Sequence, residues 1–109
     1  MARETIVRGV LERVYAERFR QDEKWGEQNH VIVTPEAAKN NLEIANAYKM
    51  LCDHAAGHVL LTWEQILLEE VFEALSTLDP DEQITELVQV AAVACAMVEC
   101  IERNRGKHL

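Results

Sequence analysis

The sequence lacks the short motifs that mark several large classes of enzyme. Its four glycines stand alone at positions 9, 26, 57 and 106, so there is neither a G-x-x-x-x-G-K-[ST] phosphate loop nor a G-x-G-x-x-G dinucleotide fingerprint. A G-x-S-x-G nucleophile elbow and an H-E-x-x-H zinc motif are absent as well. These absences exclude the nucleotide-binding loops and hydrolase sites that such motifs build.

Residues that favour β-structure and turns are also scarce. The chain has two prolines, four glycines and only 6% aromatic residues, while 49% of its residues are hydrophobic. It shows little of the alternation of β-branched residues that is typical of strands. The composition therefore predicts an all-α protein. Its 109 residues fit a single domain, residues 1–109, with a modest core that oligomerisation would help to complete.

Positive charge is the third shortage. A formal net charge of −8 argues against nucleic acid or an anionic membrane as partner, because both reward clustered Lys and Arg. The three cysteines are odd in number and lack metal-ligand spacing, so reduced core thiols in a cytoplasmic protein are expected: Cys52, Cys95 and Cys100. The N-terminus is no signal peptide and no uninterrupted apolar run reaches the ~18 residues of a membrane span, which predicts a soluble, cytosolic protein.

What the chain does have is a well-marked helical hairpin between residues 62 and 103. Thr62 and Gln65 have the spacing of a capping box, which sets the start of its first helix. Asp79 can cap the second helix, and Pro80 suits the first helical position. The intervening turn implies that the two helices run antiparallel.

Acidic residues converge on one patch of this hairpin. Glu73 and Glu86 lie at similar distances from the Asp79 turn, and at ~1.5 Å per residue both are about 10 Å from the tip. Glu70 and Gln89 are level one turn further down, and each pair is spaced i, i+3 on its own helix. Three carboxylates and one amide should therefore meet.

A solvated acidic face is the simpler interpretation of these glutamates. However, every residue of 87–98 except Gln89 is apolar, which predicts a helix buried in a bundle or a subunit interface. A polar group in such a run needs a partner, and the carboxylates of the preceding helix are the ones at its level. An internal polar cluster is thus favoured.

The remaining segments predict two further helices. Apolar spacing gives a first helix over about residues 3–22, and a polar segment that overlaps its end gathers Arg20, Gln21, Lys24 and Trp25 around Gly26. Cations and an aromatic ring can bind phosphates and stack on a base, although a polar loop pinned by a core tryptophan is the alternative. Thr34 and Pro35 start another helix that Gly57 should end, and the last helix should reach Arg105.

Two further groups of polar residues are weaker candidates for ligand binding. Asparagines 40, 41 and 46 could reach a ligand from the second helix, and His54 and His58 have a spacing that can bind metal, although Gly57 separates them. The hairpin lacks the Glu-x-x-His pairs of ferritin-like di-iron bundles. Oxygen-only ligands suit a hard cation, so Mg²⁺ is the expected cofactor, with Mn²⁺ as an alternative.

The pattern Glu69-Glu70-x-x-Glu73, twelve residues, then Glu86-x-x-Gln89 resembles the EExxE…ExxD signature of the MazG-like all-α nucleoside triphosphate pyrophosphohydrolases, a superfamily that includes dimeric dUTPases. The segments 17–28 and 67–74 resemble a small single-domain branch of phages and bacteria. The resemblance implies a four- to five-helix bundle completed by a homodimer or homotetramer, in the cytoplasm of a bacterial or phage-infected cell. It also implies Mg²⁺-dependent hydrolysis of a nucleoside triphosphate to monophosphate and pyrophosphate.

The resemblance also assigns roles. Glu70, Glu73 and Glu86 would bind the metal, and Glu69 would orient the attacking water or bind metal through water. Arg20 or Lys24 would neutralise phosphate charge, with Gln21 and Trp25 contacting the nucleotide. Gln89 stands where the family has aspartate; an amide oxygen can coordinate Mg²⁺ but brings no charge. An active hydrolase, a nucleotide-binding relative with little turnover, and a purely structural oligomer all remain open.

Overall fold

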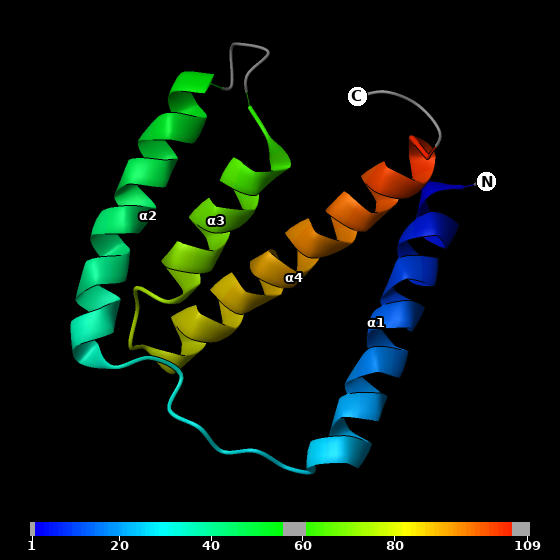
Figure 1. Cartoon of the computed structure of the whole chain (residues 1–109), viewed down its shortest axis with the longest axis horizontal. Helices are drawn as coiled ribbons and strands as arrows, with labels where there is room; N and C mark the ends of the chain where they lie inside the picture. Colours follow the sequence, from blue (N-terminus) through cyan, green and yellow to red (C-terminus); the bar gives the residue numbers. More distant parts are fainter. Residues whose placement is uncertain (1, 56–60, 106–109) are drawn as a thin grey trace. The chain divides into compact units, whose positions relative to one another are not determined.

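The computed structural model describes residues 2–55 and 61–105, and this part of the chain contains four α-helices and no strands. They are α1 (Arg3–Trp25), α2 (Pro35–Ala55), α3 (Trp63–Ala74) and α4 (Pro80–Arg103) (Figure 1). The predicted all-α fold is therefore confirmed.

The chain divides into two compact units. Unit 1 comprises Met1–His30 with Cys95–Leu109, and unit 2 comprises Val31–Ala94. Helix α4 is continuous and contributes residues to both, its first part to unit 2 and its last part to unit 1. The two units are considered separately below.

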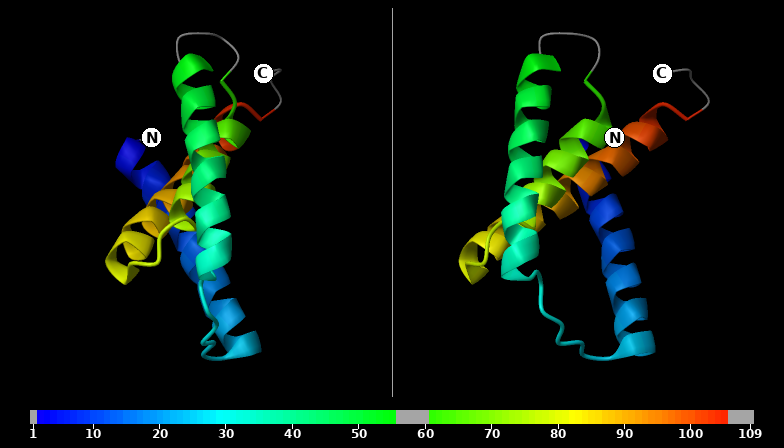
Figure 2. Two further views of the ribbon diagram at one scale, coloured as in Figure 1. Left: turned by 90° about the vertical axis from the view of Figure 1, so that its left-hand side faces the viewer. Right: turned by 60° about the vertical axis from the view of Figure 1, so that its left-hand side comes forward.

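In unit 2, α2 and α3 lie side by side (Figures 1 and 2). Tyr48 stacks on Phe72 with ring centroids 5.8 Å apart, and the Asn41 side chain donates to the Leu75 carbonyl at 3.0 Å. The face of α2 toward α3 is built from small residues, which allow close approach of the helices: Ala38, Ala45 and Cys52 are all buried. Leu42, predicted in the same stripe, is 49% exposed because contact with α3 covers only the small-residue side.

The predicted caps of unit 2 are confirmed. Thr62 Oγ1 accepts from the Gln65 N–H while Gln65 Oε1 accepts from the Thr62 N–H, both at 3.2 Å. Asp79 Oδ2 accepts from the Glu82 N–H at 2.9 Å at the start of α4. Thr34 Oγ1 accepts from the Ala37 N–H at 3.2 Å at the start of α2. Side chains satisfy these amide groups and so set where each helix begins. Gly57, predicted to end α2, lies outside the described residues.

In unit 1, α1 packs on the end of α4. Val10 is buried, and Arg13 pairs with Glu102 at 3.3 Å. Helix α1 continues to Trp25, about one turn beyond the predicted end at Asp22. It stops at Gly26, whose φ of 67° is in the left-handed region that glycine adopts readily and whose N–H donates to the Asp22 carbonyl at 2.8 Å. Lys24 and Trp25, which follow the predicted end, therefore belong to the last turn of the helix rather than to a loop.

Helix α4 ends at Arg103 rather than Arg105, because the Asn104 side chain donates to the Cys100 carbonyl at 2.9 Å and caps the last turn. Its apolar run is only partly covered within the described chain: Leu87 is 40% exposed and Val88 63%. Burial of this face in a bundle or a subunit interface stays a prediction. Among the described residues, α4 alone is also long and apolar enough to cross a membrane, with a mean hydropathy of 1.8 over 18 residues, which qualifies the expectation that no segment is. Core helices of soluble proteins meet that test too.

Candidate metal centre

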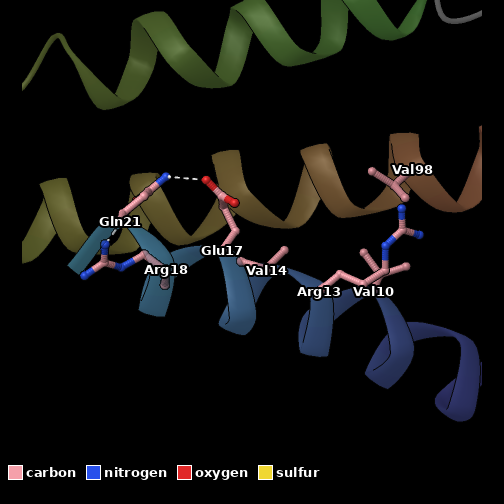
Figure 3. A pocket seen from close by; sticks show the side chains of 7 residues that line it. All are labelled: Val10, Arg13, Val14, Glu17, Arg18, Gln21 and Val98. Atoms are coloured by element: carbon pink, nitrogen blue, oxygen red, sulfur yellow. Dashed lines mark hydrogen bonds between the residues drawn. The ribbon is translucent and has the colours of Figure 1, made fainter. Parts of the chain in front are cut away.

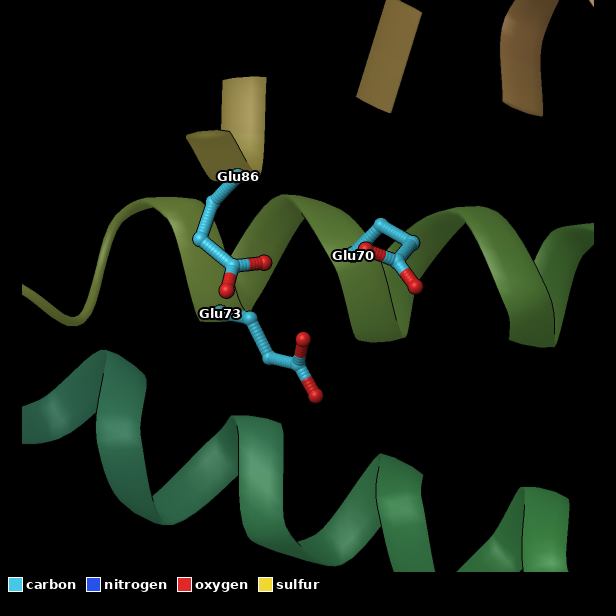
Figure 4. A group of neighbouring side chains, drawn as sticks. All are labelled: Glu70, Glu73 and Glu86. Carbon is cyan, nitrogen blue, oxygen red and sulfur yellow. The ribbon is translucent and has the colours of Figure 1, made fainter. Parts of the chain in front are cut away.

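The α3–α4 hairpin brings three carboxylates together. Glu70 and Glu73 come from α3 and Glu86 from α4, and one oxygen from each lies within 4.8 Å of the others (Figure 4). All three side chains are partly buried. The prediction that these three residues meet is confirmed. They meet because the capping residues that set where each helix starts also set the register of the hairpin. We refer to Glu70, Glu73 and Glu86 as the carboxylate cluster.

Gln89 joins the cluster as a hydrogen-bond donor. In the amide orientation that satisfies both of its polar atoms, Nε2 donates to Glu70 Oε2 at 3.0 Å and to Glu86 Oε2 at 3.2 Å. The side chain itself is exposed. In this arrangement Gln89 places two positively polarised hydrogens between two carboxylates, so it offsets part of their repulsion without contributing a ligand oxygen.

Protonation is favoured at two members of the cluster. Burial, and then the charges of Glu70, Glu86 and Glu69, raise the pKa of Glu73 to about 7. The pKa of Glu70 is also raised, first by burial and then by Glu86 and Glu69. Each effect penalises the charged form of a carboxyl group. At neutral pH Glu73 is therefore partly protonated, unlike an ordinary glutamate, and a cation could replace its proton.

Glu69 lies beside the cluster and faces α2. Burial and a hydrogen bond to the Glu69 carboxylate raise the pKa of the Cys52 thiol to about 11. Glu69 is thus held from the α2 side by a neutral donor, and its charge also acts on Glu70 and Glu73. No sequence pattern predicts this contact, because only the packing of α2 on α3 determines which residue faces Glu69.

The predicted nucleotide-binding residues gather in unit 1, at the end of α1. Arg20, Gln21, Lys24 and Trp25 line a small cavity of about 200 Å³ together with Glu17. Lys24 Nζ lies 4.9 Å from the Trp25 ring centroid, a cation–π contact. Because α1 extends through this segment, residues 17, 20, 21 and 24 share one helical face.

Glu17 is the member of this cavity that sequence reasoning missed. The Arg20 guanidinium donates to Glu17 through two nitrogens, at 2.9 Å from Nε and more closely from Nη2. This pairing lowers the pKa of Glu17 and raises that of Arg20. The i, i+3 spacing could have indicated the pair. Arg20 is therefore already engaged with a carboxylate.

A second cavity of unit 1, about 310 Å³, lies along α1 and the end of α4 (Figure 3). Val10, Val14 and Val98 supply its apolar wall. Its polar groups bond to one another: Arg18 donates to Gln21 Oε1 at 3.0 Å, and Gln21 donates to Glu17 at 3.4 Å. With its polar groups satisfied, this cavity presents mainly apolar surface.

The remaining candidates stay untested or have a structural role. Asn41 is used structurally, since its side chain donates to the carbonyl of Leu75, the C-cap of α3. His54 lies in the last turn of α2, whereas His58 lies outside the described residues. Cys52 and Cys95 are buried free thiols, as predicted, whereas the free thiol Cys100 is partly exposed rather than in the core.

The chain was compared with protein-family models, with curated proteins and with solved structures, and none of the three comparisons found a match. What is established is an all-α chain of four helices within its described residues, with a carboxylate cluster that could hold a metal ion.

Proposed function

We propose that the protein is a Mg²⁺-dependent nucleoside triphosphate pyrophosphohydrolase that converts NTP or dNTP to the monophosphate and pyrophosphate. The observation that carries the proposal is the carboxylate cluster, in which three oxygens from two helices lie within 4.8 Å of one another. The resemblance of Glu69-Glu70-x-x-Glu73 and Glu86-x-x-Gln89 to the MazG-like signature supports the same assignment.

The donor set fits Mg²⁺. Carboxylate and amide oxygens are its usual protein ligands, and the ion typically takes one or two carboxylates, with substrate phosphates and water completing its shell. Three partly buried carboxylates are a costly arrangement for a helix surface, since like charges at this spacing repel, and the pKa values of Glu70 and Glu73 are raised by burial and by the neighbouring charges. A divalent cation would make the same arrangement favourable. Glu70, Glu73 and Glu86 are the residues that would hold it.

Bound Mg²⁺ would polarise the phosphoryl oxygens and lower the pKa of a coordinated water. Glu69, next to the cluster, would accept a hydrogen bond from the attacking water and orient it for in-line attack on the α-phosphorus. The bond between that phosphorus and the oxygen bridging to the β-phosphate then breaks, and pyrophosphate leaves. In unit 1, the resemblance assigns Lys24 and Arg20 to phosphate oxygens and Trp25 to stacking on a base, roles that suit cations and an aromatic ring.

The assay of this proposal is product formation. Purified protein with Mg²⁺ is incubated with ribo- and deoxyribonucleoside triphosphates, and monophosphate and pyrophosphate are quantified. Glu73→Ala should lower the rate more than ~100-fold, because removing even an outer partner of a metal ligand costs 10–100-fold. Glu64→Ala, an exposed glutamate on the first turn of the same helix, is the matched control and should retain the rate. Equal rates in the two variants would remove the carboxylate cluster from the mechanism.

A second candidate function is nucleotide binding with little turnover, as a sensor or sink. Gln89 favours it, because its amide brings no negative charge and in this structure turns its nitrogen toward the carboxylates. In that case Mg²⁺ with a nucleotide would raise the melting temperature, since a ligand of the folded state stabilises it, while no product would form.

Nucleotide substrates and free thiols both suit the cytoplasm, where we place the protein as a homodimer or homotetramer.

A further inference from the structure

Helix α1 carries an apolar face that unit 1 leaves uncovered. Leu11 is 50% exposed, Tyr15 71% and Phe19 59%. Tyr15 and Phe19 stack on each other with ring centroids 6.4 Å apart. Val10, by contrast, lies toward the other side of the helix and is buried. We call the face that contains Leu11, Tyr15 and Phe19 the Tyr15 face.

Charged residues flank this face in an unusual order. Leu11 and Phe19 are each four residues from Tyr15, on opposite sides. Glu12 lies three residues before Tyr15, and Arg18 lies three residues after it. Arg8 lies seven residues before Tyr15, and Asp22 lies seven residues after it. At 100° per residue all seven fall on one side of the helix, within an arc of about 120°. Apolar character is therefore symmetric about Tyr15, and charge is antisymmetric.

Such a pattern is what a helix needs to pair with its own copy. A two-fold axis brings the same surface together from both subunits, so each residue meets its mirror position in the partner. An antiparallel pair centred on Tyr15 would place Leu11 against Phe19 of the second copy. It would also place Arg8 against Asp22 and Glu12 against Arg18, each contact occurring twice. A parallel pair would instead set Arg8 against Arg8 and Glu12 against Glu12.

The local geometry leaves room for this pairing. Arg8, Leu11, Glu12 and Tyr15 line a shallow hollow on this face, where the Phe19 ring of a second copy would enter. Within the chain, Arg8 pairs with Glu4 at 3.1 Å and Arg18 with Asp22 at 3.5 Å. These are exposed i, i+4 pairs on side chains that are 63–77% accessible, and such pairs contribute little. They can be exchanged for contacts across an interface.

We propose that the Tyr15 face is a homodimer interface in which two copies of α1 pair antiparallel about Tyr15. The charge pattern identifies a second copy as the occupant, because an unrelated partner would have no need for antisymmetry about one residue. The pairing uses no residue of the carboxylate cluster, so it stands or falls independently of the proposed hydrolysis.

Cysteine crosslinking tests the register. Tyr15→Cys should give a disulfide-linked dimer on oxidation, because the two copies meet at the axis. Arg8→Cys should not link to itself, since its copies would be about 20 Å apart along the axis and a disulfide needs Cα atoms within about 7 Å. Arg8→Cys mixed with Asp22→Cys should link. The unmodified protein controls for its own three cysteines. Self-linking of Arg8→Cys, or no linking by Tyr15→Cys, would overturn the pairing.

Charge exchange tests the energetics on protein without added cysteines. Sedimentation equilibrium should show a dimer whose dissociation constant rises about tenfold or more in Arg18→Glu, because two like-charge contacts with Glu12 replace two attractive ones. The double variant Glu12→Arg/Arg18→Glu restores opposite charges and should recover the dimer, which also shows that the fold survives. A monomeric natural protein, or a double variant no tighter than Arg18→Glu, would refute the interface.

Discussion

The carboxylate cluster and the cavity at the end of α1 differ in whether opposite charges are paired within the group. In the cluster, charges of one sign are gathered by two helices and partly buried, so that the pKa of Glu73 rises to about 7. At the end of α1, Arg20 already holds Glu17, and the pKa of each moves toward its charged form. The like charges of the first group could be compensated by a cation, whereas the second group already contains its own opposite charges. The contrast indicates that the cluster in unit 2 could hold a metal ion, while a phosphate at Arg20 would have to compete with Glu17.

The largest effect on this contrast should come from Gln89→Asp. The change removes an amide that donates to Glu70 and Glu86 and adds a fourth carboxylate. The metal-free protein should lose about 1 kcal/mol of stability, a fall of roughly 4 °C in melting temperature for a domain of this size. Mg²⁺ affinity should rise about tenfold. Calorimetric titration with Mg²⁺ and thermal melts in a chelator measure the two effects, and weaker Mg²⁺ binding would show that Gln89 is itself the better ligand.

An intermediate effect is expected from pH. Relative to the ordinary carboxyl pKa of 4.5, the pKa of Glu73 is raised to about 7. The folded metal-free protein therefore binds more protons than the unfolded chain between these values, and its stability falls as pH rises through that window. Mg²⁺ competes with the same protons, so its affinity should increase roughly fivefold to tenfold from pH 6 to pH 8.

Glu73→Gln is the control for this pH dependence, since it removes the titrating group and keeps the shape of the side chain. Thermal melts with and without Mg²⁺ across pH 5–8 give the comparison. If the natural protein and Glu73→Gln show the same pH profile, Glu73 is not the group that exchanges its proton for the metal.

The smallest effect should come from Glu17→Gln. The substitution releases Arg20 from an exposed ion pair, and such pairs are weak, so nucleotide affinity should improve only about two- to fivefold. Arg20→Gln is the matched variant and should weaken binding instead. Fluorescence of Trp25, which lines the same cavity, is a convenient readout. If both variants leave affinity unchanged, this cavity does not bind the nucleotide.

The sequence predicts a structural feature well when the residues that determine the feature are close together in the chain. Glu73 and Glu86 were found by counting from the Asp79 turn, because capping residues fix both helix starts and a short turn fixes the register. The extra turn of α1 is not predicted by the sequence, since Lys24 and Trp25 are compatible with either helix or loop and the helix ends only at Gly26. Contacts that depend on packing between helices left no local signal.

Exposure was the property least accessible from sequence. An apolar run predicts that α4 is covered, but not by what, and Leu87 and Val88 remain exposed in the described chain. The direction of the Gln89 amide was equally hidden, because it depends on two carboxylates from different turns and helices. Whether Glu69 faces water or a neighbour likewise required the position of Cys52 on α2.

Because Cys52 contacts Glu69 between α2 and α3, the reactivity of the Cys52 thiol can report when these two helices separate. Cys52 is 8% exposed and its pKa is about 11, so at neutral pH only about one thiol in ten thousand is the reactive thiolate. Alkylating reagents should reach the partly exposed Cys100 first. Labelling of Cys52 would then occur only when α2 separates from α3, and its slow rate would time the opening of the helix pair that supports the carboxylate cluster.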